Sequence, residues 1–228
     1  MEKSVIVFGG SGRIGKEVIR ALFREHEFEY TIYNADINPE PTYLSLPIRC
    51  DVLNAFSVAG VFSKLSEHGS IHAIIDCTYP KPPRYMKHNW YHQPSDDFTT
   101  FFNQHLTKAI RLCKHAYEYR VNNVVLLSSM YGTIIPGDIY EGTAIKRPPL
   151  EYCTAKAGLE HMVRYLSKDI HINAIAPAGI ESPEMDELFK ENYRKRYGEF
   201  TKAEDVGNLA EYLISEKGHG INGQILHI

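Results

Sequence analysis

The chain has few of the features that mark secreted, membrane-spanning or metal-dependent proteins. Its four cysteines lie far apart without a Cys-x-x-Cys pair, so we expect reduced thiols in a cytoplasmic protein. No run approaches the ~20 apolar residues of a membrane span, and no signal-peptide pattern opens the chain. The 11 histidines show no His-Glu-x-x-His or similar ligand spacing, so no metal site is predicted.

An excess of charge of one sign is also missing. Lys and Arg total 25 against 28 for Asp and Glu, which leaves a net charge of −3. This balance gives no reason to expect nucleic acid or an anionic membrane as a partner. The length of 228 residues suits one domain with a substantial core, and no linker-like shift in composition or internal repeat divides it. We therefore expect a single domain over residues 1–228.

The first informative segment is a glycine-rich turn near the N-terminus. Ser4–Phe8 is a short apolar run typical of a buried strand. Gly9-Gly10-Ser11-Gly12-Arg13-Ile14-Gly15 follows, and apolar residues then repeat at helical spacing. A strand, a glycine-rich turn and a helix in this order are typical of dinucleotide binding, because the turn allows close approach and the helix offers free N–H groups to a pyrophosphate. The alternative is a turn with a purely structural role.

Asp36 is the residue that bears on the choice of dinucleotide. It follows the next expected strand and lies 21 residues after Gly15. A carboxylate there can accept hydrogen bonds from ribose hydroxyls and would repel a 2′-phosphate, which favours NAD over NADP. The alternative is an ordinary turn aspartate, and Arg13 in the glycine turn is a cation that would suit a phosphate.

Apolar runs alternate with helical periodicity along the rest of the chain. Strands are expected at Tyr30–Tyr33, Leu46–Cys50, Ile71–Ile75, Val121–Ser128, Ile170–Ile175 and Gln224–Ile228. Helices are expected at Asn54–Glu67, Ser95–Tyr119 with Ser95 as its cap, Glu151–Ser167, Glu184–Tyr197 and Lys202–Glu216. This alternation predicts a single-domain α/β fold, a Rossmann-type doubly wound parallel sheet of about seven strands with helices on both faces.

Three loop regions are candidates for the substrate pocket: residues 78–94, 133–150 and 180–200. The first contains four prolines among cations and aromatic rings, which opposes a regular element. Its place after a strand end is where ligands of open α/β sheets bind. With the basic cluster Lys190–Arg196, it would suit an anionic sugar. The alternatives are a surface excursion or oligomer contact for the loop, and a solvated face for the cluster.

Tyr152 and Lys156 form a candidate catalytic pair. Residues four apart lie on one face of a helix, within reach of the same ligand. A phenol is a poor base at neutral pH, but a neighbouring ammonium favours the phenolate and lowers its pKa from about 10. The pair is therefore expected to move a proton at physiological pH, although Tyr and Lys also meet at this spacing by chance.

Taken together, the segments resemble the short-chain dehydrogenase/reductase family over nearly the whole chain. The glycine turn is similar to the family's cofactor loop, and Asp51-Val52 resembles the dipeptide placed beside the adenine. Pro177-Ala178-Gly179-Ile180-Glu181-Ser182 resembles the segment at the nicotinamide end. The resemblance implies cofactor contacts from Gly9, Ser11, Gly12, Arg13, Ile14, Gly15, Asp36, Asp51, Val52, Cys77, Tyr152, Lys156, Pro177, Gly179, Ile180 and Ser182.

The resemblance also implies four catalytic residues and a reaction. Asn103, Ser129, Tyr152 and Lys156 match the family's active-site positions, and Ser129 is the serine followed by two residues and a glycine. Tyr152 would exchange a proton with a secondary alcohol or ketone while a hydride passes to or from NAD. Lys156 would hold the nicotinamide ribose and, together with the positive nicotinamide ring, lower the pKa of Tyr152. Ser129 would hydrogen-bond the reacting oxygen, and Asn103 would position a water that connects Lys156 to solvent.

Within the family, the pocket-side segments are most similar to the flagellin-modification protein A-like group. This similarity implies a sugar, sugar phosphate or nucleotide sugar of bacterial surface-glycan biosynthesis as substrate. The chain departs from the family at Arg13, where glycine is usual, and at Ala178. Asp76-Cys77-Thr78-Tyr79 replaces the usual Asn-Asn-Ala-Gly, and the gap between Ser129 and Tyr152 is longer than usual.

Two other functions compete with this prediction. The glycine spacing and the longer gap also suit an epimerase or dehydratase acting on a nucleotide sugar. A dinucleotide-sensing regulator without turnover is the alternative outside enzymes, although such proteins usually lack the tyrosine. The family commonly pairs through its two long helices, so a homodimer or homotetramer is expected.

Overall fold

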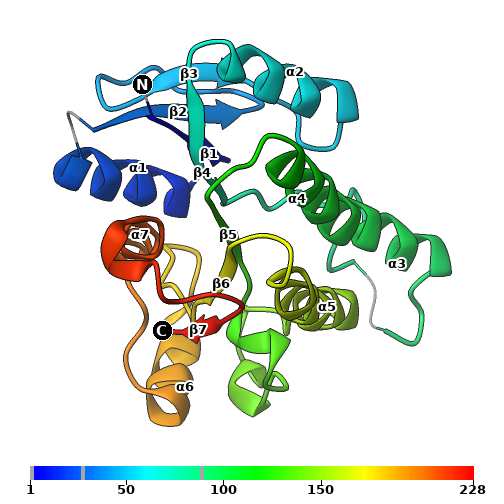
Figure 1. Cartoon of the computed structure of the whole chain (residues 1–228). Coiled ribbons are helices and arrows are strands. Elements are labelled where there is room, and N and C mark those ends of the chain that lie inside the picture. Colours follow the sequence, from blue (N-terminus) through cyan, green and yellow to red (C-terminus); the bar gives the residue numbers. More distant parts are fainter. Residues whose placement is uncertain (1–2, 27–28, 88–89) are drawn as a thin grey trace.

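The computed structural model describes residues 3–26, 29–87 and 90–228. Within them, seven parallel strands form one sheet in the order β3-β2-β1-β4-β5-β6-β7 (Figure 1). The strands are β1 (Lys3–Phe8), β2 (Tyr30–Asp36), β3 (Leu46–Arg49), β4 (Ser70–Asp76), β5 (Asn123–Leu127), β6 (Ile172–Ala176) and β7 (Ile225–His227). The predicted doubly wound sheet is confirmed. Its strand order reverses between β1 and β4, where ligands bind in such sheets.

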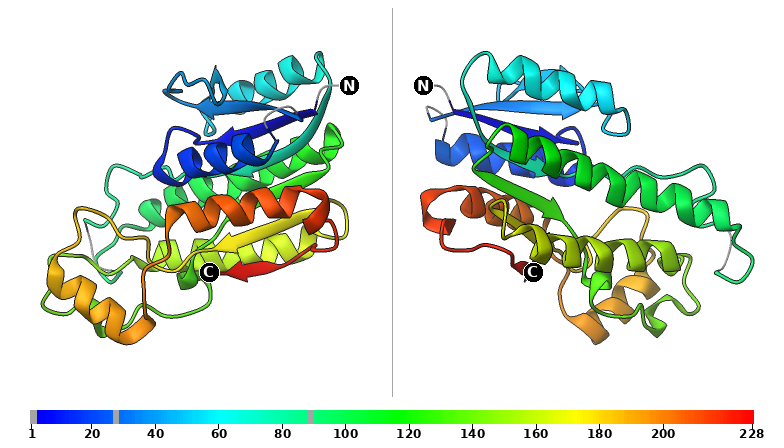
Figure 2. Two further views of the ribbon diagram at one scale, coloured as in Figure 1. Left: turned by 90° about the vertical axis from the view of Figure 1, so that its left-hand side faces the viewer. Right: turned by 45° about the vertical axis from the view of Figure 1, so that its right-hand side comes forward.

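Helices cover both faces of the sheet. Figures 1 and 2 show α1 (Arg13–His26) and α7 (Ala203–Ile214) on one face, and α2 (Ala55–Ser66), α4 (Lys108–Glu118) and α5 (Leu150–Leu166) on the other. Strand β1 is buried on both sides because alternate residues point in opposite directions. Val5 and Val7 pack with the α1 and α7 layer, whereas Ile6 and Phe8 pack with the α2, α4 and α5 layer. Each such side chain contributes about 1.5–3 kcal/mol when fully buried.

A smaller unit lies beyond the carboxyl ends of the last strands. Helix α6 (Glu187–Tyr197) packs against a short 3₁₀ helix at Asp138–Tyr140 (Figure 2). Met130, Ile139, Phe189 and Tyr193 form a separate apolar cluster between them. Two of the expected loop regions, residues 133–150 and 180–200, therefore fold against each other through their own small core.

The predicted continuous helix over residues 95–119 is wrong in one respect. The segment comprises α3 (Ser95–Phe102), a π-helical turn (Asn103–Thr107) and α4. Such widened turns occur often at functional sites, and periodicity alone does not reveal them. Ser95 is also not the cap, because Pro94 occupies that position and no side chain caps the helix. In contrast, the Asn54 side chain caps α2 by accepting from the N–H groups of Phe56 and Ser57, at 2.9 and 3.1 Å.

The π-helical turn buries His105. Its ring stacks on Phe101 with centroids 4.0 Å apart, and its Nε2 lies 3.0 Å from the carbonyl oxygen of Pro80. That oxygen can only accept, so Nε2 carries the proton. Burial, followed by the charges of Lys156 and Lys108, lowers the pKa of His105 to about 3. The imidazole is therefore neutral in the folded protein at any pH near neutrality.

The buried neutral histidine makes the fold sensitive to acid. An unfolded histidine titrates near 6.5, so between that pH and about 3 the unfolded chain binds one more proton at this residue. Stability must fall as the pH falls through this window. We expect His105 to account for about 2 kcal/mol of the stability lost between pH 7 and pH 5, and a His105→Gln variant to lack this loss. Urea unfolding at both pH values measures it.

The matched control for this measurement is His68→Gln, which changes an exposed histidine. Its loss of stability between the two pH values should equal that of the wild type. If His105→Gln also lost as much stability as the wild type, His105 would not be a neutral buried group.

Candidate functional site

A cavity of 710 Å³ opens at the carboxyl ends of β1, β2 and β4. One wall is the glycine turn that joins β1 to α1. Gly9 has a φ of +75°, which favours glycine, and a Cβ on Gly15 would lie 2.2 Å from the carbonyl oxygen of Gly9. The turn therefore needs glycine at both positions. It brings the N-terminus of α1, with its free N–H groups, to the cavity, which suits a dinucleotide pyrophosphate.

Asp36 lies at the rim of the same cavity, at the end of β2. Its carboxylate accepts from the N–H groups of Ser11 and Asn38, at 3.2 and 3.0 Å. Arg13 also lines the cavity, but its guanidinium donates to the carbonyl oxygen of Glu181 at 3.0 Å. This contact joins the glycine turn to the segment after β6, on the opposite wall.

The structure brings together most of the residues predicted to bind a cofactor. The cavity is lined by Gly9, Gly12, Arg13, Ile14, Asp36, Asp51, Val52, Cys77 and Ile180. Ser11 and Gly15 build the turn behind this surface, as the contacts above show. Pro177 is buried and accepts from the N–H of Met130, and Gly179 accepts from the N–H of Thr201. Ser182 donates to Glu184 at 2.5 Å, outside the cavity lining.

Three of the four predicted catalytic residues meet beyond the end of β5. Ser129 is the second residue after β5, and its hydroxyl hydrogen-bonds the phenol of Tyr152 in α5. Lys156 lies one turn further along α5, with its Nζ 5.8 Å from the centre of the Tyr152 ring. This ammonium donates to the carbonyl oxygen of Leu127 at 2.6 Å. Alcohol, phenol and amine are thus close together at one strand end, as their spacing predicted.

The charge state of this group differs from the prediction. We expected Lys156 to lower the pKa of Tyr152, yet burial raises the pKa of this phenol, opposed by the hydrogen bond from Ser129. Burial and then the nearby charge of Lys108 lower the pKa of Lys156 to about 8. The sequence pattern places the two groups on one face but does not show how deeply both are buried, and burial disfavours the charged form of each.

The structure does not bring Asn103 to this group. Its side chain is exposed, and its amide oxygen accepts from the hydroxyl of Thr107 at 3.3 Å. The π-helical turn instead directs His105 inward, close enough to Lys156 for that charge to lower its pKa. His105 is therefore the residue of this turn whose side chain is buried near Lys156, whereas a water positioned by Asn103 to connect Lys156 to solvent stays a prediction.

Sequence reasoning also missed a buried polar group at the end of β4. Asp76 and Lys108 are each only 3% exposed, and the Lys108 Nζ lies 2.5 Å from Asp76 Oδ2. Thr78 completes the group, with its hydroxyl 2.7 Å from the same Nζ. The available signal was Asp76 itself, because an acidic residue that ends an apolar strand needs a buried partner.

Tyr79 lies between this group and the phenol of Tyr152. Its ring lines the cavity and meets the Tyr152 ring edge-on, with centroids 5.7 Å apart. Lys81 lines the cavity beside it, with its Nζ 5.7 Å from the centre of the Tyr79 ring. The ring of Tyr79 therefore contacts both the cavity and Tyr152. His88, in the same predicted loop, lies outside the described residues.

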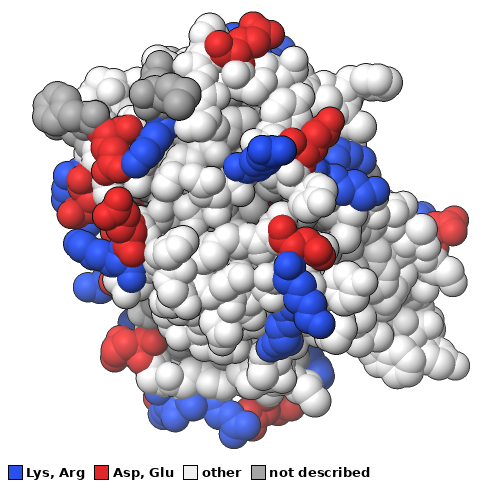
Figure 3. All heavy atoms as spheres, viewed as in Figure 1, with Lys and Arg blue, Asp and Glu red and all other residues white. Residues whose placement is uncertain are grey.

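The basic cluster in α6 is largely neutralised by its neighbours. Lys190 contacts the carboxylates of Glu181 and Glu187, at 3.2 and 2.8 Å. Arg194 contacts Glu181, and Lys195 contacts Glu191 within the helix. Figure 3 likewise shows both signs of charge interspersed on the face seen in Figure 1. The solvated-face interpretation of this cluster fits these contacts better than an anion-binding role.

The described residues contain no cluster of three or more histidine, cysteine or acidic side chains that could hold a metal ion. None of their helices is both long and apolar enough to span a membrane.

Comparisons with known proteins identify relatives over nearly the whole chain. Residues 24–228 match a family model described as "Enoyl-(Acyl carrier protein) reductase". "Post-translational flagellin modification protein A" of Campylobacter coli is 25% identical over 246 residues, covering 98% of this chain and 95% of the relative. "Glucose 1-dehydrogenase 2" of Bacillus subtilis is 22% identical over 253 residues, covering 99% and 93%.

A solved structure shares the fold. The short chain dehydrogenase of Leptospira borgpetersenii serovar Hardjo-bovis, with bound NAD⁺, superposes with a TM-score of 0.82 at 21% identity. The superposition covers 100% of this chain and 91% of that protein. Because the family model spans most of the sequence, the chain belongs to the short-chain dehydrogenase/reductase family of oxidoreductases.

Proposed function

We propose that this protein transfers a hydride between NAD and a secondary alcohol or ketone of a sugar, sugar phosphate or nucleotide sugar. The observation that carries the proposal is the joint placement of Ser129, Tyr152 and Lys156 at the end of β5, next to the cavity built by the glycine turn. Residues 78–94, 133–150 and 180–200 of the single domain would enclose the substrate.

The chain's own residues would handle the proton. When bound, the nicotinamide supplies the hydride acceptor or donor. Tyr152 would take the hydroxyl proton of an alcohol, or give one to a carbonyl oxygen. Ser129, already hydrogen-bonded to that phenol, would hold the same oxygen in reach. Lys156 would donate to a ribose hydroxyl with the hydrogens that Leu127 does not use.

The contacts of Asp36 and Arg13 support NAD over NADP. The carboxylate at the end of β2 would accept from ribose hydroxyls, and its charge opposes a 2′-phosphate. The guanidinium of Arg13 keeps its charge, but its hydrogen bond to the carbonyl oxygen of Glu181 directs it towards the segment after β6.

The proposal of a sugar as substrate rests on the relatives and on the aromatic side chains around Tyr152. One relative is named as a glucose dehydrogenase and another as a flagellin modification protein. Tyrosines from two loops lie near Tyr152. An anionic group on the substrate would have to be met by Lys81 at the cavity, since Lys190 and Arg194 are paired with carboxylates. The proposal includes a role for the protein in surface-glycan synthesis, carried out in the cytoplasm.

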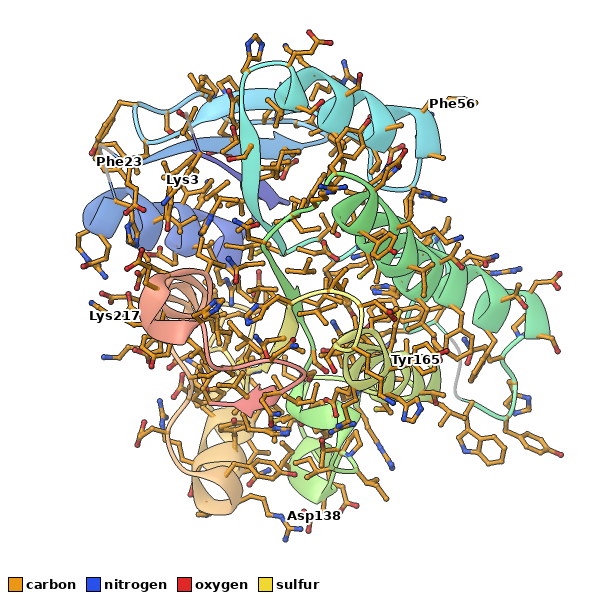
Figure 4. All side chains as sticks on the ribbon, in the orientation of Figure 1. Lys3, Phe23, Phe56, Asp138, Tyr165 and Lys217 are labelled. Carbon is orange, nitrogen blue, oxygen red and sulfur yellow. The ribbon has the colours of Figure 1, made fainter. Side chains whose placement is uncertain are left out.

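A homodimer would bury an apolar groove between α4 and α5. The groove has a volume of 310 Å³ and is lined mainly by apolar side chains, among them Ile110 and Ile170. Tyr117 and Tyr165 stand beside it, 66% and 71% exposed, and Figure 4 shows Tyr165 at the surface of α5. Exposed aromatic rings beside an apolar groove are typical of an interface.

Tyr152→Phe tests the proposed reaction. We expect wild-type protein to form NADH with at least one member of a panel of sugars, sugar phosphates and nucleotide sugars. The variant should bind NADH normally but react about 10²–10⁴-fold more slowly, because the phenolic proton carrier is lost. Tyr165→Phe, which changes an exposed tyrosine of the same helix, should react at the wild-type rate. A Tyr152→Phe protein as fast as wild type would rule out the proposed role.

Asp36→Ser tests the cofactor preference. Wild-type protein should bind NADH at least about tenfold more tightly than NADPH, a difference of about 1.4 kcal/mol. Removing the carboxylate should bring the dissociation constants for NADH and NADPH closer together, chiefly by improving NADPH binding. Fluorescence titration with both nucleotides measures it. Tighter binding of NADPH by the wild type would overturn the assignment of NAD.

Tyr165→Arg tests the dimer. A charge placed next to the apolar groove should shift the protein towards monomer in size-exclusion chromatography with light scattering. Tyr212→Arg, on α7 at the other face of the sheet, is the control and should not change the mass. A monomeric wild type would contradict the proposed interface.

A further inference from the structure

Two residues of one helical segment bind residues 76–80, which contribute to the wall of the cavity. Lys108, at the start of α4, contacts the carboxylate of Asp76 and the hydroxyl of Thr78, at 2.5 and 2.7 Å. His105, in the preceding π-helical turn, donates to the carbonyl of Pro80 at 3.0 Å. Residues 76–80 are thus held at both ends, by side chains three residues apart on the same helix.

The held segment forms part of the cavity wall. Cys77, Thr78, Tyr79, Pro80 and Lys81 all line the cavity. The carboxylate of Asp76 also accepts from the N–H of Thr78 at 3.1 Å, which turns the chain as it leaves β4. The course of the whole wall therefore depends on where Asp76 and Thr78 are fixed.

The wall also contacts the glycine turn. A Cβ added to Gly9 would lie 3.0 Å from the backbone of Cys77 and Thr78, so the two backbones already touch. On the other side, Tyr79 meets the ring of Tyr152. A shift of Thr78 would consequently change the space between the glycine turn and the catalytic phenol.

Stability alone does not account for the buried ion pair. Taking an ammonium and a carboxylate out of water is expensive, and a buried pair is often no more stabilising than apolar residues of similar size. The Lys108 Nζ nevertheless makes charge-assisted bonds to both Asp76 and Thr78, which fix direction as well as distance. The ion pair therefore fixes the positions of Asp76 and Thr78.

We propose that Lys108 and His105 are positioning residues for the cofactor, which fix residues 76–80 against the glycine turn and Tyr152. The inference rests on the proposed function, in that the cavity is taken to bind NAD. Neither residue needs to touch the reacting atoms. A misplaced wall would weaken NADH binding and slow the reaction together, since small displacements near a reacting centre are costly.

The test replaces the ion pair by an apolar pair, Lys108→Met with Asp76→Val. Either single change would leave a buried charge without its partner and destabilise the fold, whereas the apolar pair avoids this cost. We expect the double variant to keep a melting temperature near that of the wild type. It should nevertheless bind NADH at least about tenfold more weakly in fluorescence titration. Lys64→Met, which removes an exposed lysine of α2, is the control and should change neither quantity.

His105→Phe tests the hydrogen bond between His105 and Pro80 without changing the charge of the folded protein. This variant is the alternative test if the Lys108→Met, Asp76→Val protein does not fold. The new ring can still stack on Phe101, but the bond to Pro80 is lost. We expect NADH binding several-fold weaker. Wild-type affinity in either folded variant would overturn the inference alone, with the proposed function intact. Absence of NADH binding by the wild type would overturn both.

Discussion

The site depends on one close contact between two backbones. Where β1 and β4 end side by side, the glycine turn touches Cys77 and Thr78 so closely that a Cβ at Gly9 would lie 3.0 Å from them. From this contact the chain diverges, on one side into α1 and on the other into residues 78–94. The cavity lies between the two branches. Its shape therefore follows from the pairing of the two strands and from the residues that hold each branch in place.

Burial of charge is the second constraint. Lys108 and Lys156 are both buried, and only Lys108 has a carboxylate within 4.0 Å. The pair of Lys108 with Asp76 holds the pKa of Asp76 below its usual range, although burial alone would raise it. Lys156, which donates to a carbonyl oxygen, has its pKa lowered to about 8. The same helix layer thus contains one ammonium that is neutralised structurally and one that remains available for a ligand.

The sequence predicted those features of the fold and the site that depend on the local order of residues. The strands and the glycine turn follow from periodicity and strand ends. The spacing of Tyr152 and Lys156 predicts that they share one face of a helix, and the family resemblance points to Ser129, which lies near them. The sequence could not predict contacts made across the fold. His105 was missed because a π-helical turn rotates the inward face away from Asn103, and no periodicity signals it. The partner of Asp76 lies 32 residues away, so only the packed structure identifies Lys108.

The raised pKa of Tyr152 shows what the protein alone does not provide. Burial makes the phenolate costly, and neither Lys156, at 5.8 Å from the ring, nor the bond to Ser129 compensates fully. In the proposed reaction, a positive charge brought by the ligand would oppose this effect of burial on the pKa of Tyr152. An oxidised nicotinamide bears such a charge, whereas a reduced one does not. In the proposed reaction, proton removal by Tyr152 would therefore be favoured only with the oxidised cofactor, which couples the protein's acid–base chemistry to the direction of hydride transfer.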